Sequence, residues 1–225
     1  MNFSDFLFNI SAKPIRVLGP TIQASKYVSM DLSENNDTLN AIDVSSASKL
    51  GKYVNNFISQ HQAEVAYGGY LEVRNIYKRS EHFNSQAQDE RNIHIGIDLW
   101  CASKSPIYAP FSGTIHSFKN NTNYGDYGPT IILKHTIEGV VFYTLYGHLS
   151  ADSIENLQEG QLISKGEPFA VLGDETVNGN YPPHLHFQII KDLQGLKGDY
   201  PGVCSKKDLE FYRLNCPDPN LLLKL

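Results

Sequence analysis

Short apolar runs separated by turn residues dominate the chain from Gly68 onward. Runs of Val, Ile, Phe, Tyr and Thr are bounded by Gly, Pro and Asn, which is typical of β-strands. The pattern predicts strands at residues 107–109, 113–118, 130–135, 140–146, 168–172 and 185–190. Glu138-Gly139 forms a tight-hairpin signal between two of them. Because no helical pattern lies between the strands, the sequence predicts a mainly β fold with a compact antiparallel sheet.

The first 66 residues have a different pattern. Residues 27–32 alternate polar and apolar side chains and predict a strand, whereas 33–43 are rich in Asn, Asp and Ser and predict a loop. Apolar residues then recur at helical spacing, which predicts a helix of about four or five turns capped by Ser45 or Ser46; they are Ala47, Leu50, Val54, Phe57 and Ile58. A short helix is expected at Ser205–Asn215. These patterns divide the chain into an N-terminal α/β extension (1–66), a β-rich body (67–191) and a C-terminal tail (192–225).

Composition and charge indicate a globular protein and argue against a nucleic-acid-binding or membrane-spanning one. The chain has 225 residues, of which 41% are hydrophobic and 19% are charged. This length and hydrophobic content are sufficient for a globular core that needs no disulfide or metal ion to stabilise it. The net charge of −5 and the lack of a basic run argue against a protein that binds nucleic acid. No apolar run reaches 18 residues, so no membrane-spanning helix is expected.

The cysteines and the N-terminus bear on location. Cys101, Cys204 and Cys216 are an odd number with no metal-site spacing and indicate reduced thiols, with a Cys204–Cys216 bridge as the alternative. The first 16 residues carry Asp5 ahead of any base and lack an unbroken apolar stretch, unlike a secretory signal. A cytoplasmic protein is expected, with export by another route left open, and the oligomeric state is also open.

Two histidines alternate with apolar residues near the end of the β-rich body. In a strand, His184, His186 and Gln188 would share one face, while the residues between them point into a core. Two imidazoles on one face, with backbones roughly 6.5–7 Å apart, can address a common point. A lone His-x-His pair is nevertheless more often structural than metal-binding.

A second pair lies upstream, at His94 and Asp98. In a straight strand the two would be roughly 13 Å apart, too far for one metal ion, but Gly96 between them permits a bend. Two His and one carboxylate with a position left for water is the ligand set of a catalytic zinc site. His148, at the end of a predicted strand, can accept a proton from a metal-bound water or bond to a developing oxyanion. Asp126 and Asp174 lie in turns and are expected to be solvated.

The order of these motifs resembles the lysostaphin-type (LytM-like) zinc metallopeptidases, which cleave peptide bonds in bacterial cell-wall peptidoglycan. The resemblance spans about residues 68–190, and the segments that carry it are His94-Ile95-Gly96-Ile97-Asp98-Leu99, Ala109-Pro110-Phe111-Ser112-Gly113-Thr114-Ile115, Tyr146-Gly147-His148-Leu149, Gly160-Gln161-Leu162-Ile163-Ser164-Lys165-Gly166, Leu172-Gly173 and Pro183-His184-Leu185-His186-Phe187. It implies a barrel-sandwich-like β fold with a groove over the metal. A Glu commonly stands where this chain has Gln188.

Carried over by position, the resemblance implies that His94, Asp98 and His186 hold Zn²⁺. His148 and His184 would be the non-ligating catalytic pair. The implied activity is metalloendopeptidase hydrolysis of a peptide or a peptidoglycan-type cross-link by metal-activated water. Gly68-Gly69-Tyr70, Asn178-Gly179 with Pro182-Pro183, and the tail 216–220 are most similar to a branch fused to kinase-like and aminotransferase domains.

Two other functions stay open: a non-catalytic binding or scaffold module of the same fold, and a zinc hydrolase of a small amide. Two hypotheses for the role of the N-terminal extension are also open. Asn35-Asn36 or their neighbours could lie across the groove and fill the open zinc position, or the extension could pack on the β-core as an added layer. His61, His82, His116 and His135 have no motif around them and are expected to be surface or core residues.

Overall fold

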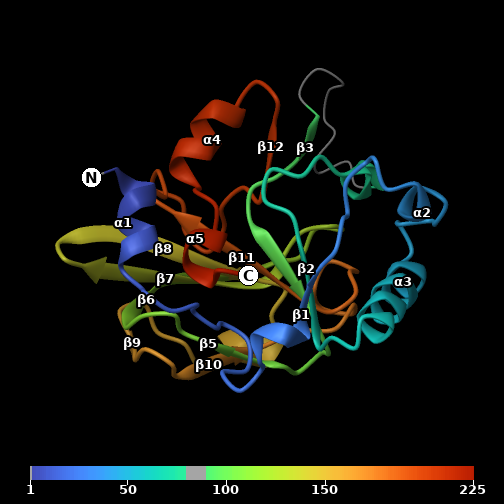
Figure 1. The fold of residues 1–225 in the computed structure, drawn as a ribbon. Coiled ribbons are helices and arrows are strands. Elements are labelled where there is room, and N and C mark those ends of the chain that lie inside the picture. Colours follow the sequence, from blue (N-terminus) through green and yellow to red (C-terminus); the bar gives the residue numbers. More distant parts are fainter. Residues whose placement is uncertain (1, 80–89) are drawn as a thin grey trace.

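The computed structural model describes residues 2–79 and 90–225, and its largest element is an eight-stranded sheet (Figure 1). Only its outer pair β1–β2 is parallel, and every other neighbouring pair is antiparallel. In spatial order the strands are β1 (Tyr27–Ser29), β2 (Val65–Gly68), β4 (Ile97–Trp100), β11 (His184–Ile190), β8 (Val140–Gly147), β7 (Gly128–Ile137), β6 (Gly113–Asn121) and β9 (Leu162–Ile163). The prediction of a mainly antiparallel β fold is confirmed.

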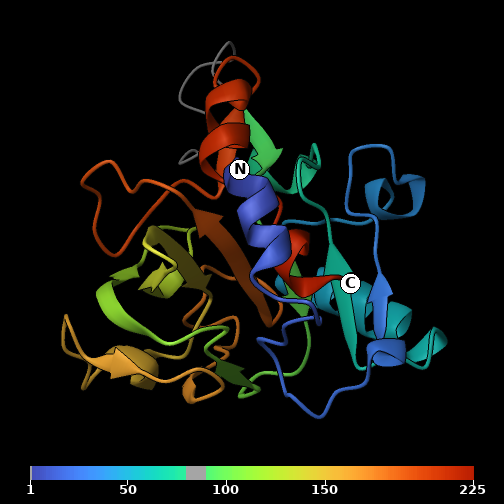
Figure 2. The ribbon, with the colours of Figure 1, turned by 60° about the vertical axis from the view of Figure 1, so that its left-hand side comes forward.

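Two small antiparallel pairs and several short helices complete the fold. The pairs are β5 (Pro106–Tyr108) with β10 (Pro168–Val171), and β3 (Arg91–His94) with β12 (Val203–Ser205). The α-helices are α1 (Phe3–Asn9), α2 (Asp37–Asn40), α3 (Ala47–Gln60), α4 (Leu209–Asn215) and α5 (Asn220–Leu223). Near the two ends of the chain, α1 and α5 lie in contact (Figure 2). None of the helices in the described part of the chain has both the length and the apolar character needed to span a bilayer.

The six strands predicted within the β-rich body are all present, with ends that differ by up to three residues. The predicted helix is α3, and Ser46 caps it because its Oγ accepts a hydrogen bond from the Lys49 N–H at 3.4 Å. The predicted loop 33–43 contains the single turn α2, and the tail helix begins only at Leu209. All three cysteines are free thiols, so the alternative Cys204–Cys216 bridge is not formed.

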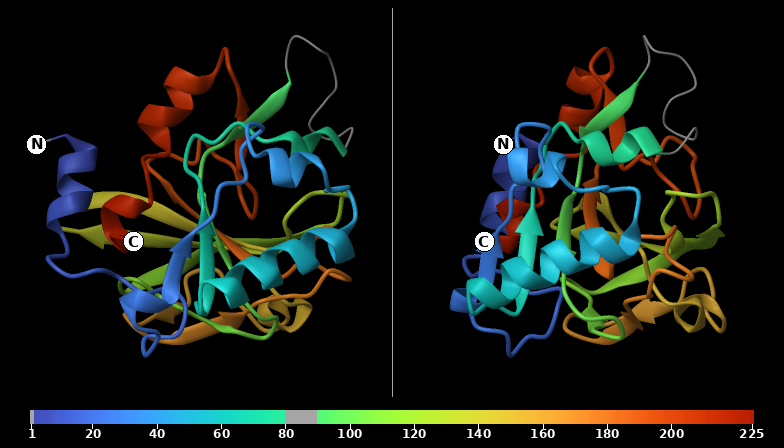
Figure 3. Two further views of the ribbon diagram at one scale, coloured as in Figure 1. Left: turned by 45° about the vertical axis from the view of Figure 1, so that its right-hand side comes forward. Right: turned by 90° about the vertical axis from the view of Figure 1, so that its right-hand side faces the viewer.

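The extension is built onto the sheet rather than lying apart from it. β1 pairs with β2, and β2 pairs with β4, so the main-chain ladder runs unbroken from residue 27 to the centre of the body. The helix α3 lies across this edge of the sheet (Figure 3). Its Leu50 and Val54 pack with Met30, Ala66 and Trp100 in one buried cluster. Apolar burial thus fixes α3 beside β4, the strand that carries Asp98.

His135, which was expected to be either a surface or a core residue, lies in the core and makes the stability of the fold depend on pH. It is fully buried, and its ring accepts from the Thr144 hydroxyl through Nε2 (2.8 Å) and donates from Nδ1 to the Ser112 carbonyl (3.1 Å). Burial lowers the pKa of His135 from 6.5 to about 4. The unfolded chain therefore binds a proton between these pH values that the folded chain does not bind.

We expect the free energy of unfolding to be greatest above pH 6.5 and to fall by roughly 3 kcal/mol as the pH drops to about 4 through this one group. Urea titrations of the wild type and His135→Leu at several pH values isolate the effect, since the variant lacks the titrating group. The wild-type curve should be the steeper below pH 6.5. Parallel curves for the two proteins would contradict the assignment.

Candidate metal centre

The bend predicted at Gly96 brings His94 and Asp98 to one place. β3 ends at His94 and β4 begins at Ile97, so the chain breaks its strand geometry between them. Asp98 and His186 are direct partners across the β4–β11 pair, and directly opposed residues of an antiparallel pair project from the same face. The β4–β11 pair and the bend at Gly96 therefore bring the side chains of His94, Asp98 and His186 together.

The three ligand atoms are close enough to bind one ion. His94 Nε2 lies 2.9 Å from His186 Nδ1 and 3.2 Å from Asp98 Oδ1, and His186 Nδ1 lies 3.1 Å from Asp98 Oδ1. Ligands ~2.0–2.1 Å from one tetrahedral ion are about 3.3 Å from one another. All three residues are buried, so few waters can compete for the site.

Hydrogen bonds on the far side of each ring settle which nitrogen faces the centre. His94 Nδ1 donates to the Gly69 carbonyl (2.8 Å), and His186 Nε2 donates to Gln188 Oε1 (2.9 Å). His94 Nε2 and His186 Nδ1 then face the carboxylate of Asp98. Lone pairs on three atoms only 2.9–3.2 Å apart repel one another unless a proton or a metal cation lies between them. The donor set therefore fits a divalent metal ion.

Gly96 makes room for this arrangement. A Cβ built on Gly96 would lie 2.6 Å from His186 Cε1 and 2.7 Å from its Nε2. These distances are shorter than any van der Waals contact, so a side chain here would displace the ring. Glycine is thus required for the close approach of the imidazole.

A buried arginine supports Asp98 from behind. Arg74 Nη1 donates to Asp98 Oδ2 at 2.5 Å, while Arg74 Nε donates to Glu72 at 2.6 Å. Burial raises the pKa of Asp98, but the neighbouring His94 and the guanidinium of Arg74 outweigh burial and hold that pKa well below its usual range. Asp98 is consequently an anion whose Oδ1 is left for the metal.

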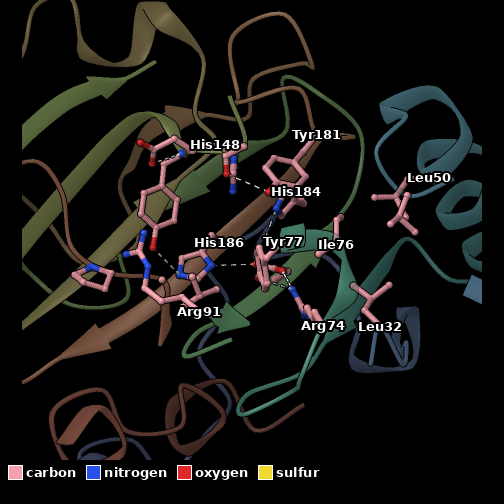
Figure 4. Close-up of a pocket in the computed structure, with 18 of the residues that line it drawn as sticks. Leu32, Leu50, Arg74, Ile76, Tyr77, Arg91, His148, Tyr181, His184 and His186 are labelled. Carbon is pink, nitrogen blue, oxygen red and sulfur yellow. Dashed lines mark hydrogen bonds and ion pairs between the residues drawn. The ribbon is translucent and has the colours of Figure 1, made fainter. Parts of the chain in front are cut away.

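The two remaining histidines lie beside the ligands (Figure 4). His148 Nδ1 donates to the Asn178 carbonyl (2.9 Å) and His184 Nδ1 to the Pro182 carbonyl (2.8 Å), so each ring presents Nε2 as an acceptor. The rings pack against each other with centroids 4.1 Å apart, and His184 Nε2 lies 4.0 Å from Asp98 Oδ1. All five residues singled out from the sequence are thus within one cluster.

Burial also controls the charge of this pair. Burial and the neighbouring His184 hold the pKa of His148 well below its usual range, and burial lowers the pKa of His184 to about 4. His184 is further fixed by stacking on Trp100, with centroids 3.9 Å apart. Both rings are neutral at pH 7 and able to accept a proton.

Asp98, His148, His184 and His186 line a cavity of ≈ 240 Å³. The sequence patterns did not identify several residues that line this cavity, including Arg74, Tyr77 and Tyr127. The prediction that Asp126 is solvated was wrong, because only 7% of its surface is exposed. Asp126 is held by the Tyr127 N–H, which donates to Oδ1 at 2.8 Å. The alternation of Glu72 and Arg74 with Leu71 and Val73 is a strand-like signal that would have placed both charges on one face.

The asparagines considered as a plug do not reach the cavity. Asn36 caps α2 by accepting from the Leu39 N–H, and its amide donates to the Asp31 carbonyl and to the Tyr53 hydroxyl. Neither Asn35 nor Asn36 lines the cavity. Of the histidines without a motif, His116 is half-buried and His61 exposed, and His82 lies outside the described residues.

Comparisons with known proteins point to one family. Residues 92–198 match the model of Peptidase family M23, which supports a Peptidase M23 domain covering just under half of the chain. The comparison with curated proteins found no match.

Solved structures with a similar fold include three peptidases. A zinc-containing peptidase from Vibrio cholerae is 25% identical over 44% of this chain and 27% of that one, with a TM-score of 0.36. A putative peptidase M23 from Pseudomonas aeruginosa is 19% identical over 58% of this chain and 43% of that one, with a TM-score of 0.39. The catalytic domain of lysostaphin from Staphylococcus simulans is 20% identical over 72% of this chain and 97% of that one, with a TM-score of 0.43. The chain thus spans less than half the length of the first two.

Gln188 gives a test of the geometry around the ligands. Its Nε2 donates to the Pro201 carbonyl (3.1 Å) and to Cys216 Sγ (3.2 Å), which turns Oε1 toward His186. We expect Gln188→Leu to weaken zinc affinity about 10–100-fold, because His186 loses the acceptor that fixes its tautomer. Competition titration with a zinc chelator measures the affinity. Gln60→Leu, at the exposed end of α3, is the control, and equal affinities for both variants would contradict the role of Gln188.

Proposed function

We propose that this chain is a zinc-dependent metalloendopeptidase that hydrolyses a peptide or a peptidoglycan-type cross-link. One observation carries the proposal: His94, Asp98 and His186 converge on a single point, and two neutral imidazoles border the same cavity. A structural metal site would be closed by a fourth protein ligand, and the described residues place only three ligand-type groups together.

The ligand set and the family match support Zn²⁺ as the metal. Two imidazole nitrogens and one carboxylate oxygen form a borderline-soft set that suits zinc. A zinc ion held here would lower the pKa of water to roughly 7 and polarise a carbonyl.

The remaining steps are proton transfer and stabilisation of the oxyanion, and residues of this chain can perform both. His148 and His184 each present Nε2 as an acceptor, and their neutral charge at pH 7 makes either ring able to take a proton from the attacking water. The ring that has received the proton becomes an N–H donor, which can hold the developing oxyanion or protonate the leaving amine. Arg74 keeps Asp98 ionised and oriented throughout.

A panel of substrates separates this function from its two alternatives. The zinc-loaded protein is incubated with muropeptides, oligoglycines and small amides, and products are identified by mass spectrometry. We expect cleavage of peptide bonds, with the activity lost on chelation and restored by zinc. Turnover of small amides alone would favour the amidase, and binding of peptides without turnover would favour a scaffold module. The likeness to the branch fused to kinase-like and aminotransferase domains stays a prediction from the sequence.

A further inference from the structure

The cavity over the metal centre has two chemically different ends. Leu32, Leu50 and Ile76 lie on one side of Arg74, and His186 and Arg91 lie on the other (Figure 4). The first end also includes Leu39, Val44 and Trp100, so its side-chain wall is apolar. Four of these residues, namely Leu32, Leu39, Val44 and Leu50, come from the first 66 positions of the chain.

From this geometry we propose that the N-terminal extension forms a specificity subsite that takes a large apolar side chain next to the scissile bond. The inference rests on the proposed peptidase function and names the substrate class of that same site. Binding an apolar side chain against a wall without charged groups is favourable, because it removes apolar surface from water. A glycine has no side chain to bury and would not add to the binding free energy in this way.

Arg74 indicates what the occupant carries besides its apolar side chain. Its Nη2 is buried and has no hydrogen-bond partner among the described residues, although Nε and Nη1 are bonded. Arg74 lines the cavity, and a buried unsatisfied donor is costly, so a bound acceptor that comes within reach of Nη2 would be favoured.

The charge around Arg74 selects the kind of acceptor. Glu72 and Asp98 already pair with the guanidinium, so Nη2 suits a neutral carbonyl oxygen better than a further carboxylate. The space beside it is tight on one side, since a Cβ on Gly68 would lie 3.3 Å from Nη2. A peptide residue supplies both groups that the subsite asks for, an apolar side chain and a main-chain carbonyl.

The test is a series of peptides acetyl-Gly-Gly-X-Gly-Gly-amide with X as Gly, Leu, Phe or Asp. The zinc-loaded wild type should cleave next to X, with kcat/KM for Leu or Phe roughly 10–100-fold above that for Gly. Val44→Asp and Ile76→Asp put a carboxylate into the half-buried part of the wall. Each should lower the Leu-to-Gly ratio about tenfold or more. Leu162→Asp, the same change at a residue that is 69% exposed on β9, should leave the ratio as in the wild type.

The outcomes distinguish the subsite from the catalytic function. Equal kcat/KM for Leu and Gly, or a ratio that Val44→Asp and Ile76→Asp leave unchanged, overturns the subsite while the peptidase stands. If none of these peptides is cleaved, the wider substrate panel decides the peptidase proposal, and calorimetric titration of the same peptides into the zinc-loaded protein decides the subsite. A dissociation constant about tenfold lower for Leu than for Gly supports it, and equal constants overturn it.

Discussion

Replacing His186 or Asp98 with Ala is expected to abolish metal binding. Each supplies one of three ligand atoms that lie 2.9–3.2 Å apart. Loss of an outer partner of a metal ligand already costs 10–100-fold in affinity, so loss of the ligand itself should cost at least about a hundredfold. Metal analysis of the freshly purified variants should show zinc at background, with turnover lost as well.

The two variants differ in their effect on the fold. Asp98→Ala leaves the buried Arg74 without one of its two carboxylate partners, which is expected to cost about 3–5 kcal/mol of stability. Asp98→Asn keeps the size of the side chain and serves as the milder variant. Asp174→Ala, in an exposed turn, is the matched carboxylate control and should keep its zinc. Stoichiometric zinc in His186→Ala would contradict the proposed ligand set.

His148→Ala is expected to keep the metal and lose turnover. His148 is not one of the three clustered ligands, and its Nε2 borders the cavity as a proton acceptor. Removing a general acid or base typically lowers the rate 10²–10⁴-fold. Zinc content together with kcat for a cleaved peptide checks both parts of this prediction.

The backbone at His148 calls for a second variant. Its φ of 63° is in the left-handed region, which Asn tolerates better than Ala. His148→Asn should therefore show the same loss of kcat with less change in the melting temperature. If either variant proves metal-free while still folded, the division between ligands and catalytic pair is wrong.

Much of the site was predictable because alternation in a strand fixes which side chains share a face. His184, His186 and Gln188 are on one face of β11, as the sequence indicates. Gly96 between His94 and Asp98 correctly predicted the bend that brings the two together. In both cases the information is local, so periodicity and one glycine are sufficient.

The supporting residues were harder to predict because they come from distant parts of the chain. Arg74 reaches Asp98 across 24 positions, and the carbonyl that orients Gln188 belongs to Pro201. The strands β2, β9 and β12 have two to four residues each, too few for a period to be seen. Residues 32–50, which supply most of the apolar wall, were predicted as the end of a strand, a loop and the start of a helix packed on the body. Their position beside the metal centre was not predicted, because only tertiary packing shows it.

X-ray absorption at the zinc edge of the zinc-loaded chain measures directly which atoms bind the ion. We expect one ion per chain with two imidazole nitrogens and one carboxylate oxygen at about 2.0–2.2 Å, plus one oxygen that the protein does not supply. Sulfur at about 2.3 Å would mean that a cysteine binds the ion. That result, or a shell closed by four protein ligands, would contradict a catalytic centre built on His94, Asp98 and His186.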